Sequence, residues 1–180
     1  MNLLLVFGQI YIPSSIKMKR LVELFNTTAD AFHCKTPEIK GLSFNECLRL
    51  YAIFTRDKAE EFINQGEEFE VKNRLYKGAY KLAQGLKKSF RVDSVEDVMK
   101  TAKLVYRILH IEFENDRKGG VLIRRCFFSS YYSKQVCELI SSLDEGLLEG
   151  LSGGTFRFSQ RMTEGKDYCR ARLSFDRSSR

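Results

Sequence analysis

The stretch HIEFENDRKGGVLIRRCFF, residues 110–128, is where the hydrophobic pattern of this chain changes its period. Ile111 and Phe113 alternate with polar neighbours, which is typical of a half-buried strand. The two glycines of RKGG can adopt positive φ without steric cost, so they favour a turn. VLIRRCFF follows as a second apolar run. The sequence therefore predicts a β-hairpin over residues 110–128.

The chain before this hairpin shows helical spacing of its apolar residues, and residues 18–109 are predicted to form helices. Ser43 and Glu46 have the spacing of a capping box, in which each side chain binds a backbone N–H of the other. Gly66 is a natural terminator for the helix that begins after Ser43. Ser94, with an acidic residue three positions later, is expected to open the last helix of this half.

The chain after the hairpin predicts one more helix and one more hairpin. QVCELISSLDEGLLEGLSGG, residues 135–154, carries an apolar stripe that ends at two glycines. TFRFSQRM and YCRARLSF then alternate apolar and polar residues around an EGKD turn, and this alternation turns Arg161 outward.

Together these patterns predict an α+β fold. Four strands are expected in one antiparallel sheet, with the helix of the hairpin-helix-hairpin part, residues 110–176, across its apolar face. The helical part, residues 18–109, packs on this unit, so that residues 18–180 form a single domain. Residues 1–17 are expected to be a poorly ordered or apolar lead.

Composition excludes several classes of protein. The formal net charge of +7 is spread over both halves, and no basic arm or nucleic-acid-binding motif accompanies it, so no nucleic-acid partner is expected. The apolar opening MNLLLVFGQIYIP lacks a basic n-region and is too short to span a bilayer, so no membrane partner is expected either. Five cysteines without a secretory signal favour reduced thiols in the cytoplasm.

Three of the cysteines fall on elements that meet in the predicted fold. Cys126 ends a strand, Cys137 lies one turn into a helix, where the helix N-terminus favours a thiolate, and Cys169 faces the core. Asp144, seven residues after Cys137, lies on the same helix stripe. One interpretation is a three-cysteine metal site for zinc or iron, completed by Asp144, His110 or water. The alternative is three ordinary buried thiols.

Other polar and aromatic residues are candidates for binding or acid–base chemistry. Arg124 and Arg125 follow a strand core, where alternation turns one inward; Arg125 could hold a substrate carboxylate bidentately, although edge arginines usually keep an edge soluble. Tyr132 could line a pocket mouth or fasten the following helix to the core. Glu164 and Asp144 could form an acid–base pair if they share a pocket.

Residues 124–173 resemble the L-2-amino-thiazoline-4-carboxylic acid hydrolase family. The likeness rests on a cysteine after a strand, a second cysteine opening a helix, an acidic helix that ends in small residues, and a closing GxxxC strand. It implies hydrolysis of a C–N or C–S bond in a small cyclic thiazoline or related carboxylate. In that role Cys137 is the thiolate or metal ligand, beside Cys126 and Cys169, Asp144 is the orienting group or general base, and Arg125 holds the substrate.

EGKDYCRARL, residues 164–173, is also similar to 4-vinyl reductase domains, which bind small molecules. This second resemblance implies the same architecture, with a 4-vinyl-reductase-like fold. The function that it implies is different: a non-catalytic sensor domain that binds a small molecule or a metal and forms a homodimer. The sequence thus leaves an enzyme and a binding module as competing hypotheses.

Overall fold

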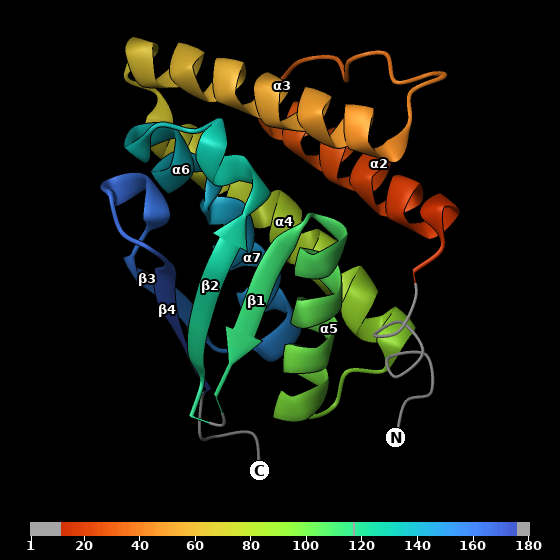
Figure 1. The fold of residues 1–180 in the computed structure, drawn as a ribbon, viewed down its shortest axis with the longest axis vertical. Coiled ribbons are helices and arrows are strands. Elements are labelled where there is room, and N and C mark those ends of the chain that lie inside the picture. The colour runs from red at the N-terminus through yellow and green to blue at the C-terminus, as the bar shows by residue number, and fades with distance from the viewer. Residues whose placement is uncertain (1–11, 117, 176–180) are drawn as a thin grey trace.

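The computed structural model describes residues 12–116 and 118–175 (Figure 1). It has the predicted α+β class, with helices first and one four-stranded antiparallel sheet later in the chain. The elements are α2 (Ser14–Ala31), α3 (Phe44–Gln65), α4 (Glu68–Phe90), α5 (Val95–Ile108), β1 (Ile111–Asn115), β2 (Gly120–Cys126), η1 (Phe127–Ser130), α6 (Lys134–Ile140), α7 (Ser142–Ser152), β3 (Thr155–Gln160), η2 (Met162–Glu164) and β4 (Cys169–Ser174).

Local signals fix most helix ends. The Ser43 hydroxyl accepts from the Glu46 amide, and the Glu46 carboxylate accepts from the Ser43 amide at 2.7 Å, so the predicted capping box is confirmed. Gly66 ends α3 with a φ of 74°. The first described helix, α2, begins at Ser14, so the expected boundary at Met18 falls inside it. Residues 1–11 of the expected lead lie outside the described residues.

The sheet places the two predicted hairpins side by side, in the order β1-β2-β4-β3. β2 and β4 form its centre, where Ile123 pairs with Cys169 and Val121 pairs with Ala171. Burial alternates along β4, so its Cys169, Ala171 and Leu173 side chains face the core. Helices α5 and α7 pack on β1 and β3 respectively. The predicted helix across the sheet is two helices, because the chain turns at Ser141 between α6 and α7.

Helices α4 and α7 cross at very short range. A Cβ added to Gly146 would lie 2.2 Å from the Tyr76 carbonyl oxygen, and one added to Gly150 would lie 2.7 Å from the Cβ of Ala83. These glycines therefore let the two helix backbones approach closely. The adjacent Glu149 is buried, and its carboxylate accepts hydrogen bonds from the Tyr76 hydroxyl, the Phe156 amide and Arg157, which ties α4, α7 and β3 together.

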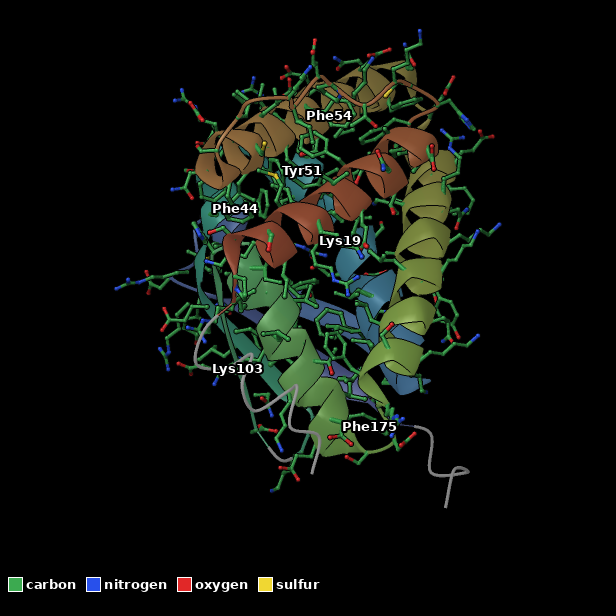
Figure 2. All side chains as sticks on the ribbon, turned by 90° about the vertical axis from the view of Figure 1, so that its right-hand side faces the viewer. Lys19, Phe44, Tyr51, Phe54, Lys103 and Phe175 are labelled. Atoms are coloured by element: carbon green, nitrogen blue, oxygen red, sulfur yellow. The ribbon has the colours of Figure 1, made fainter. Side chains whose placement is uncertain are left out.

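Helices α2 and α3 lie across the end of the molecule that is uppermost in Figure 1. Tyr51 lies between them (Figure 2), and its hydroxyl is 2.9 Å from the Thr28 hydroxyl. Its ring meets Phe25 edge-on, with the ring centroids 4.9 Å apart. Among the described helices, none is both long and apolar enough to cross a membrane.

Candidate ligand cavity

A cavity of about 550 Å³ lies between α2, α4, α5, α7 and the sheet. Its size falls within the range of roughly 300–1,000 Å³ typical of small-molecule sites. Most of its wall is apolar and comes from elements far apart in the chain. Among the apolar wall residues are Leu24, Leu82, Leu86, Leu104, Leu109, Ile123, Leu143 and Leu147.

All three predicted cysteines line this cavity, although they come from three different elements. Cys126 is the last residue of β2, Cys137 lies in α6, and Cys169 is the first residue of β4. Cys169 is buried, as its strand alternation predicts, and its sulfur accepts from the Met162 amide at 3.3 Å. The structure thus brings these side chains to one wall, which the spacings alone could not establish.

The thiols are protonated at neutral pH. Burial raises the pKa of Cys137 to about 11, and the Thr163 hydroxyl and the charge of Arg161 offset this only in part. Burial likewise raises the pKa of Cys126 to about 12 and that of Cys169 above its usual value. The raised pKa of Cys137 disfavours the thiolate that its position near a helix N-terminus suggested, because desolvation penalises the charged form.

Within residues 12–116 and 118–175, no three His, Cys, Asp or Glu side chains are grouped closely enough to hold a metal ion. The cysteines share a wall without forming a ligand set, so the expected zinc or iron site finds no support. His110 is exposed, and its ring lies near those of Phe44 and Phe127. It is not part of the cavity wall.

Two carboxyl groups of the described residues line the cavity: Glu23, which is paired with Arg20 at 2.6 Å, and Asp144. Asp144 lies in the first turn of α7, and the Tyr106 hydroxyl of α5 donates to its Oδ1 at 2.7 Å. Burial raises the pKa of Asp144 to about 6, while the Tyr106 hydrogen bond and the charge of Arg161 act in the opposite direction. The carboxyl group can therefore exchange a proton near neutral pH.

Tyr132 also lines the cavity, as one of the two sequence interpretations expected. Its ring stacks on Phe128, with centroids 5.6 Å apart. Its hydroxyl is hydrogen-bonded to the Thr55 hydroxyl of α3. The residue therefore presents its ring to the cavity while its polar atom fastens the wall to α3.

Arg125 and Glu164 are not brought to the cavity. The Arg125 side chain is 87% exposed and lies 3.6 Å from Glu112. A β-bulge lets Glu112 and Phe113 pair with Arg125 and Ile123, so Arg124 is the extra residue and both arginines face outward.

Glu164 lies at the surface, where its carboxylate accepts from the Arg161 amide at 3.0 Å and lies 3.7 Å from Lys134. Of the two predicted carboxylates, Asp144 lines the cavity with the cysteines and Glu164 does not. The expected acid–base pair of Asp144 and Glu164 is therefore not assembled in the described structure.

Arg161 is the wall residue that the sequence pattern missed. Alternation from Phe158 turned it outward, but a register shift between Phe158 and Gln160 breaks the alternation. The guanidinium instead lies over the Phe158 ring, 4.7 Å from its centroid, and donates to the Ser141 hydroxyl at 3.1 Å. No sequence signal predicted this, because the irregularity depends on how β3 pairs with β4.

Compared with models of known protein families and with curated protein sequences, the chain shows no match. The functional argument therefore rests on the cavity. Its wall combines a large apolar surface with the Arg20–Glu23 ion pair, the Arg161 guanidinium, the Asp144 carboxyl group and three neutral thiols.

Proposed function

We propose that this chain is a small-molecule-binding domain that encloses a mainly apolar ligand in the cavity. The observation that carries the proposal is the cavity of about 550 Å³ with apolar walls. Protein interiors are close-packed, with few voids larger than a water molecule. An apolar void is poorly hydrated and favours apolar guests. This is the role implied by the resemblance of residues 164–173 to 4-vinyl reductase domains.

A matched pair of valines on α5 tests the proposal. Val105 lines the cavity, whereas Val95, at the start of the same helix, is 47% exposed and lies outside it. Val105→Trp should weaken the affinity for the neutral dye Nile red, and for 1-decanol that displaces it, about tenfold or more, because the indole takes up space that the ligand would occupy. Val95→Trp should leave both unchanged. Fluorescence titration measures both affinities.

The outcome that contradicts the proposal is equally definite. If neither Nile red nor 1-decanol binds the unmutated protein, the cavity does not bind ligands. If Val105→Trp and Val95→Trp bind alike while both retain the thermal transition of the unmutated protein, the ligand binds elsewhere.

A second candidate function is the hydrolase activity implied by residues 124–173. The observation that favours it is Asp144, a carboxyl group with a pKa of about 6 on the same wall as Cys126 and Cys137. General bases work best with a pKa near the working pH. Since the thiols are protonated, Asp144 would activate water and Cys137 would contact the substrate as a neutral group.

The hydrolase candidate predicts turnover of 2-aminothiazoline-4-carboxylate that rises with pH through about 6, as Asp144 loses its proton. Asp144→Asn should lower the turnover rate about a hundredfold or more, with little change in the circular dichroism spectrum. Chromatographic detection of cysteine-derived product measures the rate. If the unmutated protein forms no product, the hydrolase candidate is contradicted. The binding proposal is tested separately, by the two valine variants.

A further inference from the structure

We infer that the ligand is an amphipathic carboxylic acid, whose carboxylate is bound by Arg161 while its apolar part fills the rest of the cavity. This rests on the proposed function, because it names the chemical class of the ligand of that same cavity.

Arg161 is a cation on the cavity wall whose charge is felt by Asp144 but which makes no close ion pair in the described part of the chain. Within the described part of the chain, no carboxylate lies within ion-pair distance of its guanidinium. Its Nη2 donates to Ser141, while its Nε is buried and has no hydrogen-bond partner there. A buried donor of a charged group that lacks a partner is costly. A ligand carboxylate would supply the missing charge and match the guanidinium geometry.

The groups around Arg161 are suited to an anion. Burial keeps the Cys137 thiol neutral, so it does not repel a carboxylate. The Ser141 hydroxyl is fixed beside the guanidinium. Asp144 is the acidic neighbour, and a ligand carboxylate beside it would favour its protonated form. Binding of the acid should therefore be accompanied by proton uptake at neutral pH.

The apolar part of the ligand has room to extend away from Arg161. The same cavity is bounded by Ile12, Leu104 and Ile108, which form an apolar cluster separate from the main core. Arg161 directly follows β3, whereas Leu104 and Ile108 belong to α5, and β3 and α5 lie on opposite sides of the sheet region in Figure 1. Arg20, the other cation among the described wall residues, is paired with Glu23 at 2.6 Å. A cavity that is otherwise mainly apolar and has Arg161 as its unpaired cation fits a charged head with an apolar tail.

The test compares a matched acid and alcohol at pH 7.5 by isothermal titration calorimetry. Decanoic acid should bind the unmutated protein at least tenfold more tightly than 1-decanol, because an ionic hydrogen bond adds this much affinity. Arg161→Gln should remove the preference for the acid and leave 1-decanol binding within about twofold. Arg161→Lys should keep part of the preference, since it keeps the charge and loses the fork of donors. Arg125→Gln, outside the cavity, should change neither affinity.

The outcomes separate this inference from the proposed function. If 1-decanol binds the unmutated protein as tightly as decanoic acid, or if Arg161→Gln keeps the preference for the acid, the assignment of the carboxylate to Arg161 is overturned and the binding function stands. If neither compound binds, both are overturned. The comparison of acid and alcohol in the unmutated protein stays decisive even if Arg161→Gln does not fold, which a thermal unfolding curve would reveal.

Discussion

The two sides of α7 differ sharply in how they pack. Toward α4, Gly146 and Gly150 bring the helix backbones so close that an added methyl group would overlap with Tyr76 or Ala83. Toward the sheet and α5, Leu143 and Leu147 form part of the wall of a cavity of about 550 Å³. One helix thus has a very close backbone contact on one side and the cavity of about 550 Å³ on the other.

The contrast shows how the chain keeps a void open. Core cavities ordinarily cost stability, and surrounding side chains tend to collapse into them. Here α7 forms one wall of the cavity. Its opposite side is held in place by the contact with α4 and by the three hydrogen bonds that Glu149 accepts. The close contact on one side therefore limits collapse on the other, and the cavity is formed before any ligand arrives.

The largest effect is expected at the tight contact. Gly146→Ala should lower the free energy of unfolding by about 3 kcal/mol, at the upper end of typical overpacking costs, because its methyl group meets the Tyr76 backbone. Chemical denaturation monitored by circular dichroism measures this change.

Gly85→Ala is the matched control, since nothing lies within 4 Å of the added methyl group in α4. It should raise the free energy of unfolding by up to about 1 kcal/mol, through helix propensity alone. Equal effects at positions 146 and 85 would contradict the contrast between the two sides of α7.

A second effect, dependent on pH and at most of similar size, is expected on the open side at Asp144. Burial raises its pKa from 3.8 to about 6, so the folded protein holds this proton more tightly than the unfolded chain. Lowering the pH from 7 through 6 toward 4 should therefore add stability from this group, about 3 kcal/mol at most. The groups that act on it are Tyr106 from α5, Arg161 after β3 and Glu145 beside it on α7.

Asp144→Asn removes this proton exchange while keeping an acceptor for the Tyr106 hydroxyl. The variant should be more stable than the unmutated protein at pH 7, and the advantage should vanish near pH 4. Urea unfolding curves at half-unit pH intervals measure the difference. An advantage that is constant across this range would show that Asp144 is not the group responsible.

The sequence predicted the features of the fold that depend on neighbours in the chain. The Ser43–Glu46 capping box, the Gly66 terminator and the hairpin around residues 110–128 each follow from local backbone chemistry, and the structure contains all of them. The inward direction of Cys169 followed from strand alternation alone. The cysteines could be placed on elements, and from those elements their approach to one region was a reasonable hypothesis.

The features that failed depend on contacts between distant segments. Register shifts in both hairpins turned Arg125 outward and Arg161 toward the cavity, which strict alternation cannot foresee. The pKa of Cys137 depends on burial beneath elements distant in sequence, and this disfavours the thiolate that its position near a helix N-terminus suggested. The cavity itself is a gap among helices and strands, so no single motif encodes it.

The strand order β1-β2-β4-β3 has a consequence for how the domain folds. Each hairpin closes locally, but the central pairing of Ile123 with Cys169 joins segments separated by α6, α7 and β3. Long loops make such pairings late and slow events in folding. Cys126 and Cys169 reach the same wall only through that pairing, so the binding site is completed with the sheet and not before. A ligand would then bind only the fully folded domain. It would slow unfolding and would not speed folding.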